Sequence, residues 1–180
     1  MLSRENAVLV IIDIQEVLLP KSEEVAAAYL ENAVKLVRAA KVLGLPILVT
    51  EQNPARLGET HPAVLPELEG LDRIPKMEFG CMGNDAFRSA LEETARNQLL
   101  IVGMEAHVCV CQTALAAIEA GYEAYVVGDA VVASSKREYK AGMRRMENAG
   151  AVPVSTQMAI FELLERAGTP EFKAMLPLLK

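Results

Sequence analysis

Strand-length apolar runs alternate with segments of helical periodicity along this chain, and this alternation limits its possible folds more than any single motif does. The apolar runs cover residues 7–14, 46–52, 72–78, 98–104, 123–129 and 151–156. All but the weak run 72–78 are almost continuously apolar, which is typical of strands buried on both faces of a sheet. Helices between such strands are right-handed crossovers between parallel neighbours. The sequence therefore predicts a Rossmann-like, three-layer α/β/α sandwich with an open, mainly parallel sheet.

The longest helical segment, residues 22–44, carries its own start and stop signals. Ser22 is a candidate N-cap, and Gly44 is a candidate C-terminal stop. The stripe expected to face the core consists of Val25, Tyr29, Leu30, Ala33, Leu36 and Val37. Shorter helical segments are expected at 84–97, 107–121, 137–150 and 156–168.

One connection, residues 53–70, is too long for an ordinary loop of an α/β protein. It contains three prolines, and the sequence is compatible with either a lid over a site or a docking arm. The full length of 180 residues matches one domain, so residues 1–180 are expected to form a single unit with one substantial core.

The net charge of −6 argues against nucleic acid and anionic membranes as partners. The first apolar run is too short to span a bilayer and is not followed by a cleavage site for a signal peptide. No GxGxxG motif follows the first expected strand, so no dinucleotide cofactor is indicated. We expect a cytoplasmic protein that acts on a small molecule without a cofactor.

Three cysteines are present, and two of them, Cys109 and Cys111, are two residues apart at the start of segment 107–121. An odd count without CxxC spacing does not form a disulfide framework and fits a reducing compartment. Residues two apart on a helix point about 200° away from each other, so only one of this pair can face a site. The same angle prevents both thiolates from binding one metal ion, and we expect no metal.

Polar residues follow the expected strands where a parallel sheet would bind a ligand, beyond its carboxyl edge. Asp13 ends the first strand, Lys76 ends the third, and Cys109 follows the fourth. A cysteine at a helix start beside a lysine is expected to have a lowered pKa, and a carboxylate can accept and return a proton. These three residues predict a nucleophile, its activator and an acid/base group. Asp129, at the end of the fifth strand, is interpreted as a turn former.

The motifs that contain these residues resemble the isochorismatase-like cysteine hydrolase superfamily over nearly the whole chain. The quoted stretches are "VIIDIQ" with Asp13 and Gln15, "PKMEFG" with Lys76 and Phe79, and "GMEAHVCVCQTALAAIEAGYEAYVVGDAV" with Cys109. Each motif alone is weak, but their order is specific. The stretch "TEQNPARLG" is similar to isochorismatase-domain-containing proteins.

This resemblance implies that the Cys109 thiolate attacks an amide-like carbonyl and forms a thioester, which water then hydrolyses. Asp13 would accept the thiol proton and pass it to the departing amine, while Lys76 orients or ionises both partners. The resemblance also implies a cis peptide bond between Met104 and Glu105. That bond would help to aim backbone N–H groups, including that of Cys109, at the oxyanion.

The pocket and the remaining thiols are less well specified. Candidates for lining the substrate pocket are Gln15, Gln52, Phe79 and His107. Nicotinamidases of this superfamily bind a metal with an Asp and two His, whereas this chain has only two histidines in total and no DxH after the second strand. Cys111 is interpreted as a packing thiol, and Cys81 as a residue that could be exposed and reactive.

Two other functional classes compete with a cysteine hydrolase. A phospho-receiver domain is disfavoured because no acidic pair follows the first strand. A catalytically idle scaffold that serves as an oligomeric interaction surface is the alternative that stays open. Whether the protein is a hydrolase or a scaffold, we expect it to form a homo-oligomer, because 52% of the residues are hydrophobic and the tail "EFKAMLPLLK" is apolar on one side.

Overall fold

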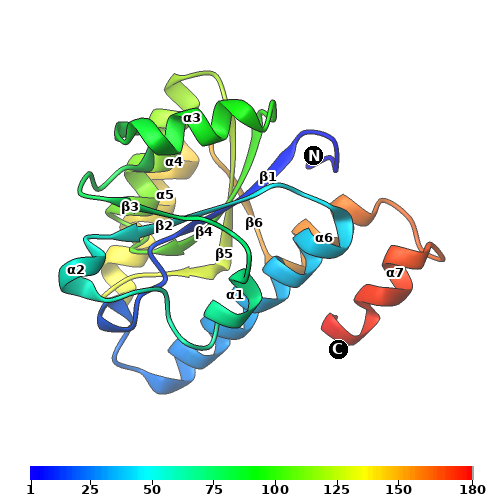
Figure 1. Ribbon diagram of the computed structural model, residues 1–180, viewed down its shortest axis with the longest axis horizontal. Coiled ribbons are helices and arrows are strands. Elements are labelled where there is room, and N and C mark those ends of the chain that lie inside the picture. Colours follow the sequence, from blue (N-terminus) through cyan, green and yellow to red (C-terminus); the bar gives the residue numbers. More distant parts are fainter. Residues whose placement is uncertain (180) are drawn as a thin grey trace.

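The computed structural model describes residues 1–179 and contains a six-stranded sheet in which every pair of neighbouring strands is parallel (Figure 1). The strand order is β3-β2-β1-β4-β5-β6. The strands are β1 (Ala7–Ile12), β2 (Ile47–Gln52), β3 (Arg73–Lys76), β4 (Gln98–Met104), β5 (Glu123–Val132) and β6 (Val152–Val154). The predicted architecture is confirmed, and even the weakest apolar run contains a strand.

Helices cover both faces of this sheet and make the outer two layers. One layer consists of α1 (Glu23–Leu43), α6 (Thr156–Leu164) and α7 (Pro170–Met175). The other consists of α3 (Asp85–Glu93), α4 (Cys109–Glu119) and α5 (Lys136–Asn148). Figure 1 shows the two sets on opposite sides of the strands. None of the helices in residues 1–179 has the length and apolarity needed to cross a bilayer.

Strand β1 explains why the apolar runs are continuous rather than alternating. All six of its residues are buried. Successive side chains of a strand point to opposite faces, and here Leu9 and Ile11 join one buried cluster while Val8 and Val10 join the other. A strand covered by helices on both faces therefore needs an apolar residue at every position.

Helix α1 begins and ends where the sequence predicts. The Ser22 hydroxyl accepts a hydrogen bond from the Val25 N–H at 3.4 Å, and Gly44 adopts the left-handed conformation with φ 68°. One stripe residue was wrongly expected to face the core: Val25 is 49% exposed, because the first turn of α1 extends past the core.

The long connection 53–70 is packed into the fold. It contains α2 (Pro54–Leu57) and a short 3₁₀ helix (Leu65–Leu68), and Val64 and Leu68 are fully buried in the core. Thr60 forms a β-bridge with Gln15, directly beyond the end of β1. The connection thus anchors residues at the carboxyl edge of the sheet.

Strands β1 and β4 approach each other closely at this edge. Gly103 has φ 128°, and a Cβ at this position would lie 2.0 Å from the Ile12 carbonyl oxygen. Only glycine fits such a backbone position without moving its neighbours. The ends of β1 and β4, which precede Asp13 and Cys109 respectively, are therefore held side by side.

Candidate active site

The structure brings Asp13, Lys76 and Cys109 together at the carboxyl edge of the sheet. Asp13 directly follows β1, Lys76 is the last residue of β3, and Cys109 is the first residue of α4. All three are buried, and Cys109, at 5% exposure, is the most accessible. Asp13 Oδ2 lies 2.7 Å from Lys76 Nζ, so the carboxylate and the ammonium form a buried ion pair.

Four oxygen atoms surround the Lys76 ammonium. Besides Asp13 Oδ2, these are Gln52 Oε1 at 2.6 Å and the backbone oxygens of Glu78 and Phe79, each at 3.0 Å. A buried charge is tolerated only when its lost hydration is replaced by such contacts. The cation is thereby fixed in place against Asp13.

Asp13 links the cation to the candidate nucleophile. Its Oδ1 accepts a hydrogen bond from the Thr50 hydroxyl at 2.8 Å, and the neighbouring Cys109 thiol is one of the groups that lower its pKa. Burial raises the pKa of Asp13 above its ordinary value, and the charge of Lys76 acts in the opposite direction. The carboxyl group is thus placed to exchange a proton with the thiol.

The expectation of a lowered thiol pKa is wrong for the free protein. Burial, followed by the negative charge of Asp13, raises the pKa of Cys109 to about 12. Lys76 does lower this pKa, as expected, but its contribution is outweighed. Sequence motifs identify the neighbouring charges but do not reveal how completely water is excluded from the thiol. At neutral pH Cys109 is therefore a protonated thiol.

Gln15 and Gln52, both expected to line a pocket, have their side chains committed to structural hydrogen bonds. Gln52 Oε1 accepts from Lys76, and its Nε2 donates to the Met77 oxygen at 3.1 Å. Gln15 exchanges hydrogen bonds with the backbone N–H and C=O of Gln52 at 2.8 and 3.0 Å, and donates to the Gly58 oxygen at 2.6 Å. The two glutamines therefore support Lys76 and the long connection.

The other two pocket candidates occupy different settings. Phe79 is 57% exposed, and the part of it that contacts the site is its backbone oxygen. His107 is half-buried next to the start of α4, and its Nδ1 is buried without a hydrogen-bond partner in residues 1–179.

The backbone before Cys109 has the unusual geometry that the resemblance implies. The Met104–Glu105 peptide bond is cis. The Glu105 carbonyl accepts hydrogen bonds from the N–H groups of Val108 and Val110. In the described part of the chain, the N–H groups of Glu105 and Cys109 have no protein acceptor. These N–H groups, in the segment that ends at the first residue of α4, are therefore free to bind an acceptor.

Cys81 belongs to the buried cluster around Asp13, Thr50 and Cys109, a position that the sequence did not predict. It was expected to be a possible exposed thiol, but it is fully buried, with its Sγ 3.8 Å from the Thr50 hydroxyl. Its N–H donates to the Thr113 hydroxyl at 2.9 Å, and that hydroxyl donates to the Cys109 carbonyl at 2.7 Å. Burial raises the pKa of Cys81 to about 11. Thr113 lies one helical turn after Cys109 and links it to Cys81.

Cys111 and Asp129 lie outside this cluster. Cys111 is buried within α4, and the charge that acts on its thiol is that of Arg145 on α5. Asp129 was expected to end the fifth strand and form a turn, but it lies inside β5. Its Oδ1 accepts hydrogen bonds from the Thr156 N–H at 2.7 Å and the Thr156 hydroxyl at 2.9 Å, so it joins β5 to the start of α6. No group of three or more His, Cys, Asp or Glu residues in 1–179 is arranged to hold a metal ion.

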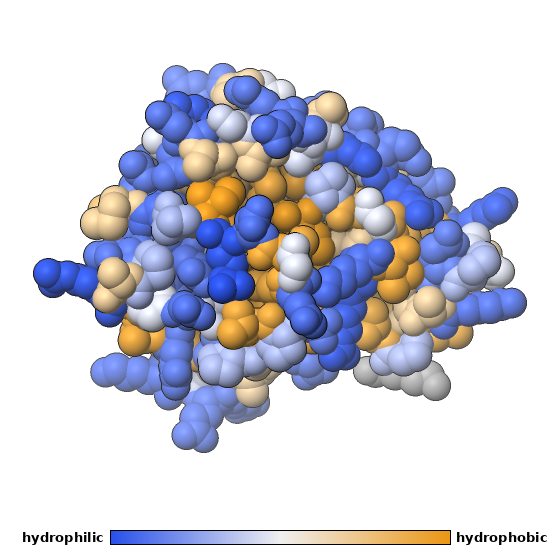
Figure 2. Space-filling view, viewed as in Figure 1, coloured by the Kyte–Doolittle hydropathy of each residue, from blue (hydrophilic) through white to orange (hydrophobic). Residues whose placement is uncertain are grey.

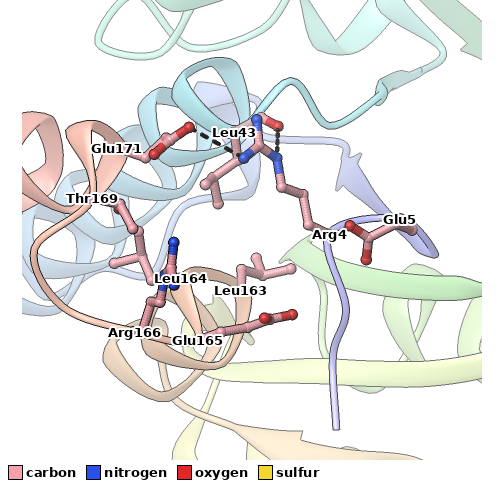
Figure 3. A pocket seen from close by; sticks show the side chains of 9 residues that line it. All are labelled: Arg4, Glu5, Leu43, Leu163, Leu164, Glu165, Arg166, Thr169 and Glu171. Atoms are coloured by element: carbon pink, nitrogen blue, oxygen red, sulfur yellow. Dashed lines mark hydrogen bonds and ion pairs between the residues drawn. The ribbon is translucent and has the colours of Figure 1, made fainter.

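A separate cavity of about 260 Å³ lies near the amino ends of β1 and β2 (Figure 3). Figure 3 shows Arg4 and Arg166 on its walls, with the Arg4 guanidinium bound to the Leu43 oxygen and to Glu171. Since chemistry in parallel sheets takes place at the carboxyl edge, this cavity is not part of the candidate site.

Known proteins resemble the chain along most of its length. The model of the isochorismatase domain family matches residues 7–158. The secreted isochorismatase effector Isc1 of Phytophthora sojae (strain P6497) is 34% identical over 179 residues, which cover 97% of this chain and 85% of that protein. Isochorismatase domain-containing protein 2 of Danio rerio is 31% identical, with 99% and 89% covered.

Solved structures agree with this result. A structure of MAR1 ribonuclease from Caenorhabditis elegans has a TM-score of 0.89 at 30% identity and covers 99% of this chain and 91% of its own. The YcaC gene product of Escherichia coli, described as an octameric hydrolase of unknown specificity, also has a TM-score of 0.89, with 98% and 89% covered. At 23% identity the latter likeness concerns the fold alone. Together with the family match, these similarities establish that the chain belongs to the isochorismatase family.

Proposed function

We propose that this protein is a cysteine hydrolase that cleaves an amide or related C–N bond of a small molecule through a thioester on Cys109. The observation that carries the proposal is the buried Asp13–Lys76 pair, 2.7 Å apart, whose two charges both act on the pKa of the Cys109 thiol. A proton acceptor and a nucleophile thus lie near each other in a water-poor environment, which is the arrangement that covalent catalysis requires.

In the first half of the reaction the Cys109 sulfur bonds to the substrate carbonyl carbon while its proton moves to Asp13. The carbonyl oxygen becomes an oxyanion, which the free N–H groups of Glu105 and Cys109 stabilise. When the intermediate collapses, the C–N bond breaks and Asp13 returns the proton to the nitrogen. The amine leaves, and the acyl group remains on sulfur as a thioester.

In the second half a water molecule attacks the thioester and gives a proton to Asp13. The same N–H groups stabilise the second oxyanion, and the C–S bond then breaks. Asp13 returns its proton to the sulfur, so the thiol is restored and an acid is released. Lys76 makes no bond to substrate; it holds Asp13 in place and favours its ionised form between the two steps.

The name of the Caenorhabditis elegans relative raises ribonuclease activity as a second candidate. Binding of RNA depends strongly on cationic groups that neutralise phosphates. With a net charge of −6, and with its buried lysine committed to Asp13, this chain lacks that electrostatic basis. The cytoplasmic location expected from the reduced cysteines stays a prediction, since one relative is a secreted effector by name.

The proposed mechanism is tested by trapping the thioester. Incubation with a panel of amides, nitriles and ureas, followed by mass spectrometry of intact protein and of peptides, is expected to find an adduct on Cys109 with at least one compound. The adduct should decay in water and release the acid. A panel that yields no adduct, although iodoacetamide labels Cys109, would favour the idle scaffold instead.

We also expect this protein to form a homo-oligomer. Figure 2 shows hydrophobic residues gathered in the middle of one face, and large exposed apolar side chains include Met77, Phe79, Met158 and Phe161. Exposed apolar groups of this kind favour association, and the related YcaC is described as octameric. Multi-angle light scattering at micromolar concentration should give a mass that is a multiple of 19.5 kDa. A monomer would contradict the expectation.

A further inference from the structure

A groove of about 750 Å³ opens at the carboxyl edge of the sheet, between the first turns of α1, the end of β5 and the start of α5. Its volume falls within the range of small-molecule sites, about 300–1,000 Å³. Its apolar wall consists of Val25, Ala28, Val131, Val132 and Ala133. None of the hydrogen bonds that hold the candidate site together involves these side chains.

One wall of this groove is hydrogen-bonded to the segment that precedes Cys109. Val131 and Ala133 line the groove and pack in the same buried cluster as Cys109. The Val132 oxygen accepts a hydrogen bond from the Ala106 N–H at 2.8 Å. The Ser134 N–H donates to Glu105 Oε1 at 2.9 Å. The groove therefore abuts the segment that carries the two free N–H donors.

One residue that lines the groove, Tyr29, carries a buried polar group without a partner. Tyr29 is only 2% exposed, and its hydroxyl makes no hydrogen bond within residues 1–179. By contrast, the hydroxyl of Tyr139, also in the groove, donates to the Gly128 oxygen at 2.8 Å. A buried hydroxyl that lacks a partner costs free energy, which a ligand acceptor would recover. Burial and the charge of Asp13 raise the pKa of Tyr29, so this hydroxyl is a donor.

We propose that this groove binds the non-reacting part of the substrate, and that this part is an uncharged, extended apolar substituent with a hydrogen-bond acceptor for Tyr29. The inference rests on the proposed function, because it assigns the groove to the substrate of Cys109. The aliphatic wall favours an apolar chain. The charged residues at the groove, two basic and two acidic, select neither an anion nor a cation; they are Lys21, Glu24, Asp129 and Lys136.

Direct binding tests the groove without requiring turnover. N-hexylacetamide is titrated into the full-length protein by calorimetry, with N-methylacetamide as the short reference. Each methylene buried is expected to strengthen binding about fourfold, so partial burial of the chain should lower Kd at least about tenfold relative to the short amide. Equal affinity for the two amides would overturn the proposal.

A matched pair of variants on α1 locates the binding. Ala28 lines the groove, whereas its neighbour Ala27 is exposed and does not. Ala28→Phe is expected to raise the Kd of N-hexylacetamide about tenfold or more. Ala27→Phe should leave this Kd as in the parent protein. If the two variants bind alike, the chain lies elsewhere and the assignment is wrong.

The role of Tyr29 is tested with a ligand that carries an acceptor. N-(5-oxohexyl)acetamide differs from N-hexylacetamide by one ketone. Tyr29→Phe should weaken binding of the ketone several-fold. Binding of N-hexylacetamide should not change, since the variant loses only the hydroxyl. Equal losses for both ligands would show that the hydroxyl does not bind the acceptor and would overturn this part of the proposal.

Protection of the thiol separates this inference from the proposed function. Saturating N-hexylacetamide should slow alkylation of Cys109 by iodoacetamide at least about fivefold, because the bound amide head covers the sulfur. Binding without protection would mean that the groove does not serve Cys109 and would overturn the proposal. Binding together with protection supports the assignment of the groove, whether or not any compound in the amide panel is hydrolysed. If none is hydrolysed, that result counts against the hydrolase mechanism alone.

Discussion

Cys109→Ala is expected to abolish hydrolysis and thioester formation, with a loss of about 10⁴-fold or more, as for nucleophiles of other covalent hydrolases. Cys111→Ser should retain most of the activity. The reason is the setting of the two thiols: the charges of Asp13 and Lys76 act on Cys109, whereas the charge of Arg145 on α5 acts on Cys111. Turnover of a substrate found in the amide panel, measured for both variants, checks this expectation.

Two controls make this comparison decisive. Cys111 is buried, so its replacement by serine introduces a hydroxyl that can cost about 1–3 kcal/mol of stability; denaturant unfolding of each variant establishes that both are folded. Cys81 is the competing nucleophile, because its thiol lies beside Thr50 in the same cluster. In the Cys81→Ser variant, the adduct from the amide panel should still form on Cys109. An adduct that persists in Cys109→Ala, on Cys81, would contradict the assignment.

The fold could be predicted because its signals are local and repeated. A strand such as β1, buried on both faces, must be apolar at each position, and helix α1 carries its cap and stop residues in its own sequence. Parallel strands then follow from the alternation of strands and helices. The packing of connection 53–70 was not predictable, since it depends on contacts of Thr60 with β2 and of Glu67 with α1, which no local pattern encodes.

The positions of Asp13, Lys76 and Cys109 could be inferred because each follows a strand, and parallel strands end at one edge of the sheet. The remaining features of the cluster depend on the directions of side chains from separate segments. Thr50 lies inside β2, and Gln52 uses both ends of its amide to hold Lys76 and its neighbour. A sequence identifies such residues as polar but does not specify their partners.

The thiol pKa illustrates the same limit in energetic terms. A lysine and a helix start are visible in the sequence and both favour a thiolate. Burial and the proximity of Asp13 have larger effects here, and they raise the pKa of Cys109 to about 12. The nucleophile is thus activated at the moment of attack, by proton transfer to Asp13, and is not stored as a thiolate.

Opposite changes in the pH dependence of Cys109 alkylation are expected from variants of its two charged neighbours. Asp13→Asn removes the negative charge that raises the thiol pKa, so the pKa should fall, while turnover is lost because the proton acceptor is gone. Each unit by which the pKa falls makes alkylation about tenfold faster at a pH below it. Lys76→Met removes the charge that lowers the pKa, so alkylation should become slower. The measurement is the rate of iodoacetamide labelling of Cys109 from pH 7 to 11, followed by mass spectrometry.

Lys76→Met leaves Asp13 buried without its cation, a change that can cost about 3–5 kcal/mol. The double variant Asp13→Asn/Lys76→Met removes both charges together and avoids this cost, so it provides a folded reference. Its labelling profile should lie at higher pH than that of Asp13→Asn alone, because the cation that favours the thiolate is missing. Coincident profiles for Asp13→Asn and the double variant would mean that Lys76 does not act on the sulfur. Coincident profiles for Asp13→Asn and the parent protein would mean that Asp13 and Cys109 are uncoupled, and the proposed proton transfer could not operate.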